Sequence, residues 1–356
     1  MDSVNKQKGI ALITVLLIVA LVTIIAAEMA VRMQMQIKRV DNLNSNQQAY
    51  WYAISAEELA KLVLNESSQD NDGVLNLTQP WAVEDMVFPV EGGQISGNIY
   101  DLQACFNINA VVEAQDNNTD DDESDSDAES AGEDTQPENE NGKKSLKPTP
   151  QEQFKSLLIL AGIDDYEAEQ IRDGVADWLD QDSIARSYGA EDYMYEAKEM
   201  PYLAANGYFV DVSELKLIQG LDNPTNGQAA LDKILPFVCV IPNNDKMVLN
   251  INTIKPEQAE VLAAMFDNKL TVAAASSVIE SRPEDGFDDI NDFWELSEIK
   301  AVGRLSKSFK EQFSLKSEFF RLKSKTEYNQ SWINLNSLIA LDKQGKFVVI
   351  AREIGV

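Results

Sequence analysis

The first 72 residues carry one uninterrupted helical pattern. From Ile10 to Ala27 there are 18 residues without a charged side chain, and as a helix they reach about 27 Å, close to the thickness of a bilayer core. Apolar residues then recur at helical spacing, and residues 10–72 contain neither proline nor glycine. The pattern predicts a single helix over 10–72, first apolar and then amphipathic. A signal anchor followed by a helical stalk would show the same pattern, and the flanking Lys and Arg residues do not fix its orientation.

Beyond this helix the pattern alternates between strand-like and helix-like segments. The predicted order is strands over 73–112, helices over 149–235, strands over 236–251, helices over 252–305 and strands over 306–356. Strands separated in this way can share one antiparallel sheet if the helical segments are insertions. We therefore expect an α+β fold.

An acidic segment divides the chain after the first strands. Residues 113–142 contain 13 acidic side chains and no basic one. Such a stretch has too little apolar surface to order itself, so we predict a disordered acidic linker over 113–148. The whole chain has 30 basic and 59 acidic residues and a net charge of −29, which argues against wholesale binding of nucleic acid.

The composition excludes most catalytic chemistry. The chain has no histidine and only two cysteines, which removes Ser-His-Asp and Cys-His catalysis, histidine zinc ligands and a four-cysteine metal site. The sequence also lacks a phosphate-binding GxxxxGK[ST] loop and a nucleophile elbow. We therefore expect a protein that is not an enzyme.

The densest group of carboxylates outside the linker lies between residues 177 and 192. Its five members are Asp177, Asp180, Asp182, Glu191 and Asp192. Oxygen ligands of this number suit calcium, although the spacing is not that of an EF-hand. A helix end and a surface loop with ordinary solvated acids remains the alternative interpretation.

The N-terminus and several internal motifs resemble one known family. Lys8-Gly9 directly before Ile10-Ala11-Leu12-Ile13 resembles the leader of type IV prepilin-like proteins, in which residues 1–9 would be removed. Most pilins and pseudopilins carry a glutamate five residues into the mature chain, where this sequence has Thr14. That lack, with the large size, is similar to the K-type minor pseudopilins of the type II secretion system. Further matches are QQAYWY at 47–52, Ala56-Glu57, DWLD at 177–180 and GAED at 189–192.

The resemblance implies a place in a secretion machine. A prepilin peptidase would cut after Gly9, and Ile10 would become a methylated N-terminus. The protein would be a single-pass inner-membrane subunit with its folded region in the periplasm. Without the glutamate at Thr14 it need not follow an earlier subunit, so it would start the pseudopilus at its tip. Its expected partners are the I- and J-type minor pseudopilins, with the H-type and major pseudopilins as further candidates.

The resemblance also implies details of fold and metal binding. The long helix would pack on an antiparallel pilin-like sheet that carries a large α-helical, SAM-like insertion. We expect Trp51, Leu59 and Leu62 of the helix to enter that core. The family binds calcium in its soluble region, which makes Asp180, Asp182, Glu191 and Asp192 the first candidate ligands, with Asp177 beside them.

The two cysteines, Cys105 and Cys239, both fall in predicted strands. In the periplasm implied by the resemblance they would pair as a disulfide. Two buried free thiols are the alternative.

A second function class comes from residues 249–294, which resemble a helix-hairpin-helix unit of DNA-uptake and repair proteins. The shared pieces are Asn250-Ile251-Asn252-Thr253, Ser281-Arg282-Pro283 and Gly286-Phe287-Asp288-Asp289-Ile290. The turn that would bind phosphate, at 265–269, lacks the Gly-x-Gly pattern, and acidic residues lie beside it. We therefore favour a protein-interaction version of this fold and keep a pilin-like component that binds DNA as the alternative.

Overall fold

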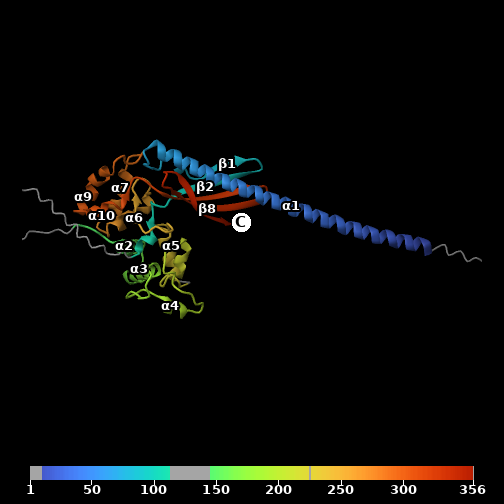
Figure 1. Ribbon diagram of the computed structural model, residues 1–356, viewed down its shortest axis with the longest axis horizontal. Helices are drawn as coiled ribbons and strands as arrows, with labels where there is room; N and C mark the ends of the chain where they lie inside the picture. The colour runs from blue at the N-terminus through green and yellow to red at the C-terminus, as the bar shows by residue number, and fades with distance from the viewer. Residues whose placement is uncertain (1–9, 113–144, 224–225, 356) are drawn as a thin grey trace, which may run out of the picture.

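The structure, a computed structural model, describes residues 10–112, 145–223 and 226–355. Figure 1 shows a long helical rod, a sheet that lies along the second half of the rod, and a helical body at the rod's far end. This architecture confirms the expected α+β fold. The predicted leader, 1–9, and nearly all of the predicted acidic linker lie outside the described residues. The linker prediction was too long at its end, because Leu146 is buried and forms a parallel bridge with Leu305.

The rod is α1 (Ile10–Asp70), a single helix of 61 residues. Its sheet-facing side carries small residues, with Ala49, Ala53 and Ala60 almost fully buried. Together with Glu57 and Leu64 these alanines are spaced three or four residues apart, so all five side chains lie on one face of the helix. Small side chains let the helix axis come close to the sheet.

The prediction that Trp51, Leu59 and Leu62 enter this core is wrong. They are 56%, 38% and 63% exposed. Trp51 and Leu62 each lie two residues from buried positions, which places them about 200° away around the helix, whereas Leu59 lies next to the buried Ala60, at the edge of the contact face. The helix is apolar on both sides, and the sequence pattern does not show which side the sheet covers.

The main sheet is antiparallel and has five strands in the order β1-β2-β7-β8-β9. They are β1 (Met86–Val90), β2 (Gly93–Asp101), β7 (Phe319–Tyr328), β8 (Ser331–Leu341) and β9 (Phe347–Gly355). The pairing of β2 with β7 runs from Gly93 opposite Tyr328 to Asp101 opposite Phe320. The whole helical body is therefore inserted between two neighbouring strands.

Aromatic side chains fill the space between α1 and the sheet. Trp81, in a short 3₁₀ helix (Pro80–Ala82), meets Phe320 edge to face with ring centroids 5.3 Å apart. Phe320 meets Phe347 in the same way. Leu64 of α1 completes this core. Burial of such side chains is the main attraction between helix and sheet.

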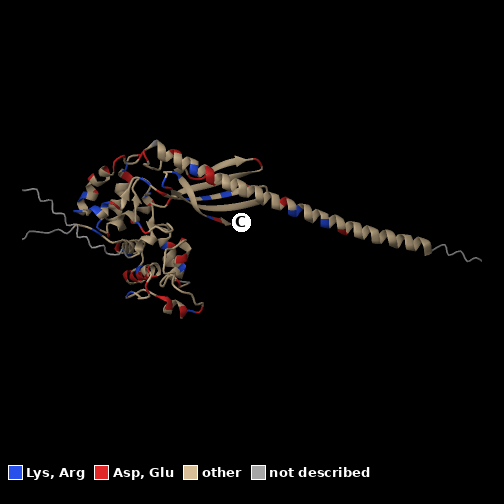
Figure 2. Ribbon diagram, viewed as in Figure 1, with Lys and Arg blue, Asp and Glu red and all other residues tan. Residues whose placement is uncertain are grey.

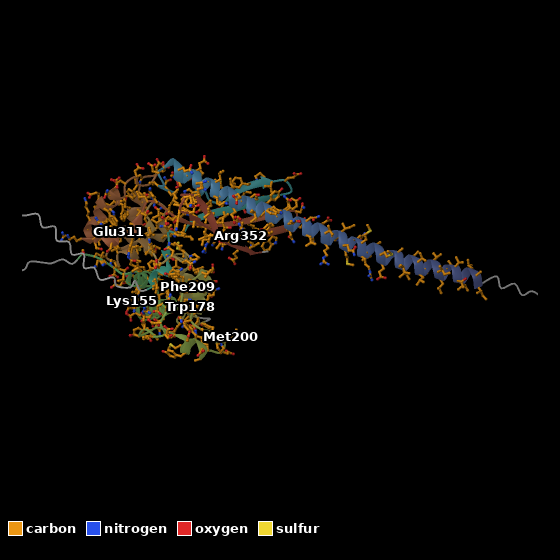
Figure 3. The ribbon with its side chains drawn as sticks, viewed as in Figure 1. Lys155, Trp178, Met200, Phe209, Glu311 and Arg352 are labelled. Carbon is orange, nitrogen blue, oxygen red and sulfur yellow. A yellow bond between two sulfur atoms is a disulfide. The ribbon has the colours of Figure 1, made fainter. Side chains whose placement is uncertain are left out.

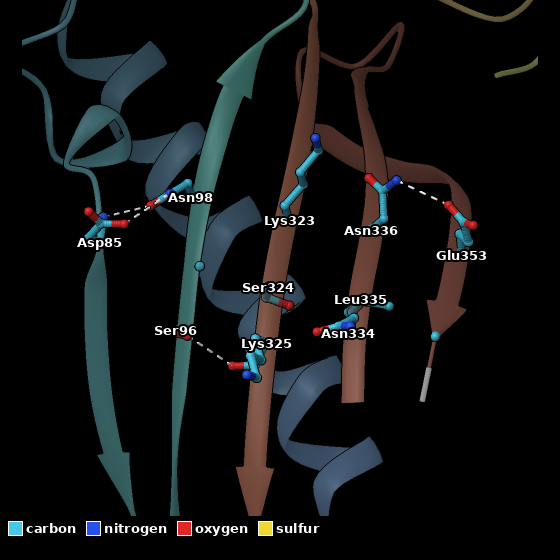
Figure 4. A pocket seen from close by; sticks show the side chains of 12 residues that line it. Asp85, Ser96, Asn98, Lys323, Ser324, Lys325, Asn334, Leu335, Asn336 and Glu353 are labelled. Atoms are coloured by element: carbon cyan, nitrogen blue, oxygen red, sulfur yellow. Dashed lines mark hydrogen bonds between the residues drawn. The ribbon is translucent and has the colours of Figure 1, made fainter. Parts of the chain in front are cut away.

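The opposite face of the sheet is open and polar. A hollow of about 510 Å³ lies there. Figure 4 shows Lys323 and Lys325 of β7 between Asn98 and Asn336 of the neighbouring strands. Antiparallel sheets commonly cover one face and leave the other in water. Among the described residues, the long helix and the short 3₁₀ helix with Trp81 cover one face of the sheet, and the helical body meets the sheet at its end near Leu338.

The helical body has one continuous core that joins both predicted helical segments. Its helices of four or more residues are α2 (Pro150–Leu160), α3 (Asp165–Leu179), α4 (Asp192–Glu196), the 3₁₀ helix Val212–Leu217, α5 (Asn226–Ile234), α6 (Ala259–Met265), α7 (Val272–Ser281), α8 (Ile290–Glu295), α9 (Ser297–Val302) and α10 (Lys307–Lys310), with a 3₁₀ helix at Ile108–Val111 before them. Trp178 and Phe209 stack within this core with ring centroids 6.1 Å apart (Figure 3).

The strands predicted over 236–251 do not join the main sheet, contrary to our expectation of one shared sheet. β4 (Val238–Cys239) pairs in parallel with β3 (Phe106–Asn107). β5 (Leu249–Asn250) pairs in parallel with β6 (Phe313–Ser314). Each pair is two residues long and fully or partly buried in the body, because its apolar side chains face the helices.

Candidate functional site

The first part of α1 has the length and composition of a membrane anchor. It is the one helix among the described residues that is long and apolar enough to cross a bilayer, and its most apolar 18-residue window is wholly exposed to the surroundings. Figure 2 shows this end of the helix free of charged residues. Thr14 lies within it, and its hydroxyl donates to the carbonyl of Ala11 at 2.9 Å. The hydroxyl is thus satisfied within the helix. Ile10 is the first described residue, and Gly9 lies outside the described residues.

The predicted carboxylate group lies at the end of α3, where acidic residues are dense (Figure 2). Asp173 and Asp177 are one helical turn apart and both are buried. They accept backbone hydrogen bonds from the loop that follows: Asp173 from Tyr188 N at 3.2 Å, and Asp177 from Arg186 N at 3.1 Å. These two carboxylates therefore fold the 180–191 loop back over the helix.

Gly189 is required by this arrangement. A Cβ atom at that position would lie 1.9 Å from Asp177 Oδ2. The Asp177 carboxylate is fixed by its own hydrogen bonds, so the loop has room only for a hydrogen there.

Three of the five predicted ligands come together above this anchor. Asp180, Asp182 and Glu191 each offer an oxygen, and these oxygens all lie within 4.8 Å of one another. Glu191 precedes α4 and is only 1% exposed. Neither of its carboxylate oxygens has a hydrogen-bond partner, and Asp180 Oδ1 also has none. Buried, unpaired carboxylate oxygens cost free energy unless a cation faces them.

The other two predicted ligands lie outside the group. Asp177 is fully buried and bonded to the loop and to Arg186. Asp192 accepts a hydrogen bond from Ala204 N at 2.9 Å. Neither residue contributes an oxygen to the group of three. Both lie close to it, and their negative charges raise the pKa of Glu191.

Electrostatics in the group favour a bound cation. Burial, followed by the negative charges of Asp177, Asp180, Asp182 and Asp192, raises the pKa of Glu191 to about 7. A divalent ion would reverse this effect by stabilising the carboxylate form. The donors are all carboxylate oxygens, which fit calcium, and the unpaired buried oxygens give the fit a physical basis.

Cys105 and Cys239 are joined by a disulfide. It lies where the end of the sheet meets the body, packed with Leu102, Ile241 and Leu338. The bridge links two points 134 residues apart. It therefore ties the start of the inserted body to a point near its middle.

The residues that resemble a helix-hairpin-helix unit serve internal hydrogen bonds. Asn252 is fully buried, and its amide donates to Phe287 O and accepts from Phe287 N. Arg282 donates to the carbonyls of Ile251 and Ile254 at 2.6 and 2.9 Å. The motif therefore holds a loop in place, and the arginine uses its donors on backbone carbonyls within the protein.

One buried charge was missed by the sequence analysis. Glu57 on α1 is 1% exposed and accepts two hydrogen bonds from Arg352 of β9, at 2.8 and 2.5 Å. Ser337 of β8 donates a third at 2.7 Å. The sequence did contain a signal for this: Glu57 lies four residues after Ala53 and three before Ala60. This spacing places the glutamate on the same helix face as the alanines, which is the face that packs on the sheet.

These features are those of a pilin-like protein, and among its described residues one helix is long and apolar enough to cross a membrane. Residues 104–243 and 249–316 match two family models, both described as type II secretion system (T2SS), protein K. Type II secretion system protein K of Aeromonas hydrophila is 35% identical, over 99% of this chain and 98% of the relative. The Pectobacterium carotovorum protein of the same name is 32% identical, over 99% and 97%. The chain therefore belongs to the type II secretion system protein K family.

A solved structure supports the same assignment. The fold is similar to a chain in the crystal structure of the GspK-GspI-GspJ complex from enterotoxigenic Escherichia coli, with a TM-score of 0.71 and 28% identity. The match covers 89% of this chain and 99% of that chain. The family models, the relatives and the solved structure give no support to the DNA-binding alternative.

Proposed function

We propose that this protein is the subunit that starts and caps a short pseudopilus of the type II secretion system, with its N-terminus in the cytoplasm and its folded region in the periplasm. The observation that carries the proposal is the position of the helical body at the end of α1 far from the membrane anchor (Figure 1). A further subunit added at the end of the filament away from the membrane would collide with this body. Thr14, uncharged within the span, supports a first position in assembly because it has no carboxylate for a preceding subunit to neutralise. The role is structural, and we propose no catalytic activity.

We propose the I- and J-type minor pseudopilins as partners, since the similar solved chain is part of a GspK-GspI-GspJ complex. The exposed side of α1 suits them. Trp51 and Leu62 stand free there, and an apolar groove of about 410 Å³ opens between Leu59 of α1 and Phe88 of the first hairpin. The amphipathic helix of a protein anchored in the same membrane would reach this height. H-type and major pseudopilins would join below.

The interface can be tested with side chains that the fold does not need. The double variant Trp51→Ala/Leu62→Ala should keep its thermal midpoint but lose co-purification with the I- and J-type pseudopilins and fail to restore secretion. Val348→Ala/Ile350→Ala is a matched control, since those residues are 36% and 50% exposed on β9. Full co-purification and secretion with the first variant would reject the α1 interface.

We propose that a prepilin peptidase cuts between Gly9 and Ile10 and that Ile10 is then methylated. This expectation rests on the Lys8-Gly9 junction before the apolar helix. Mass spectrometry of the N-terminal peptide from native membranes should find a methylated Ile10. A chain that still begins at Met1 would reject processing.

We propose that Asp180, Asp182 and Glu191 hold a calcium ion, with Asp177 and Asp192 as neighbouring charges. The ion would neutralise the buried carboxylates and hold the 180–191 loop on the end of α3. Excess chelator should lower the thermal midpoint of the purified chain, and added calcium should restore it. A midpoint unaffected by both treatments would count against a calcium site.

A further inference from the structure

Arg186 is a cationic side chain within the cluster of carboxylates. Its Nη1 lies 2.6 Å from Asp177 Oδ1 and 2.5 Å from Asp180 Oδ2. The Arg186 side chain is only 20% exposed. The guanidinium thus bridges the acid that anchors the loop and an acid of the proposed metal group.

The two carboxylate oxygens of Asp180 lie in different environments. Oδ2 faces Arg186, whereas Oδ1 is buried without a partner. Both oxygens of Glu191 are equally unpaired, and an oxygen of each residue belongs to the group within 4.8 Å. A cation in the group would therefore share the Asp180 carboxylate with Arg186.

We infer that Arg186 is an internal counter-cation of the metal site, an inference that rests on the proposed calcium binding. It neutralises part of the carboxylate charge and keeps the 180–191 loop assembled before calcium binds. The same positive charge repels the ion and competes for Asp180, so it weakens calcium binding. As a result, the folding of the 180–191 loop depends less on calcium than it would if the carboxylates had no arginine beside them.

The test compares Arg186→Gln with the wild type, using the full chain in detergent micelles. Calcium chloride is titrated into chelator-treated protein by calorimetry, and thermal midpoints are recorded with chelator and with calcium. We expect Arg186→Gln to melt lower than the wild type with chelator and to gain more from calcium. Its calcium Kd should fall by about tenfold, a change within the range typical of energetic coupling between two interacting sites.

Arg172→Gln is the matched control. Arg172 pairs with Asp173 at 2.7 Å, and Asp173 anchors the same loop, but the described contacts of Arg172 do not include Asp180. Its calcium Kd should equal that of the wild type. A second variant, Arg186→Lys, keeps the charge without the planar fork, and its Kd should stay near the wild-type value.

Each outcome decides the question. An unchanged or weaker calcium affinity in Arg186→Gln would overturn the inference, because Arg186 would then be neutral to the metal or help to build the site. If Arg186→Gln is unfolded in chelator, recovery of its near-ultraviolet circular dichroism on adding calcium supports the inference, and failure to recover overturns it. Absence of calcium binding by the wild type would instead refute the proposed metal site itself.

Discussion

The ion pair between Glu57 and Arg352 should contribute unequally to stability when its two members are removed. The Glu57 side chain is 2% exposed and that of Arg352 is 36% exposed. Arg352→Met would leave a buried carboxylate with Ser337 as its remaining donor among the described contacts, and loss of one partner of a buried pair costs about 3–5 kcal/mol. Glu57→Gln would leave an arginine that can turn toward water, so we expect a cost nearer about 1–2 kcal/mol.

The pH dependence of this difference follows from the pKa of Glu57. Burial raises that pKa, but the hydrogen bonds from Arg352 and Ser337 outweigh it, and the pKa of Glu57 lies below its usual 4.5. The stabilisation is therefore present above about pH 4.5 and is lost as the pH falls through the folded-state pKa. In Arg352→Met the unpaired carboxylate has a raised pKa and protonates more readily. The gap between variant and wild type should shrink on acidification.

Thermal unfolding of the full chain in detergent, followed by near-ultraviolet circular dichroism, measures both effects. At about 2 °C or more per kcal/mol, Arg352→Met should lower the midpoint by about 6–10 °C and Glu57→Gln by about 2–4 °C. Arg32→Gln is the control, because Arg32 pairs with Glu28 on the same helix, both side chains are largely exposed, and such pairs contribute little. A larger loss in Glu57→Gln than in Arg352→Met, or a gap independent of pH, would refute the reasoning.

Three further predictions concern the junctions of the fold. Gly189→Ala should lower the unfolding free energy by about 1–3 kcal/mol or more, because its Cβ would collide with Asp177; a midpoint equal to the wild type would contradict this. Replacing Cys105 and Cys239 together by serine should cost up to about 5 kcal/mol, from the 134-residue separation, and an unchanged denaturation midpoint would show that the bridge does not stabilise the fold. Burial raises the pKa of Asp101 to about 6 from 3.8, so its contribution is fully present below pH 3.8 and is lost as the pH rises through 6. Asp101→Asn should remove this part of the slope of unfolding free energy between pH 4 and 6, and an unaltered slope would exclude Asp101 as its source.

The candidate site was predictable in its residue types and only partly in its geometry. Five acids between residues 177 and 192 indicated a cation site, but their spacing did not separate ligands from anchors. Asp177 faces the loop because it lies one turn after Asp173 on α3, and both accept loop amides. Asp180 and Glu191 become neighbours only when the loop folds back, a step that depends on Gly189.

The sequence by itself determined the features that arise from local pattern. The uncharged stretch after Gly9 specifies a membrane span wherever the rest folds, and the absence of proline and glycine lets the helix continue to residue 70. Tertiary structure decided which face of that helix is buried. Both faces are apolar, and the sheet packs against alanines because small side chains permit close approach, which leaves Trp51 and Leu62 exposed. The partners of the strands at 238–239 and 249–250 were likewise decided by the body around them, since two-residue strands have too few hydrogen bonds to select a partner on their own.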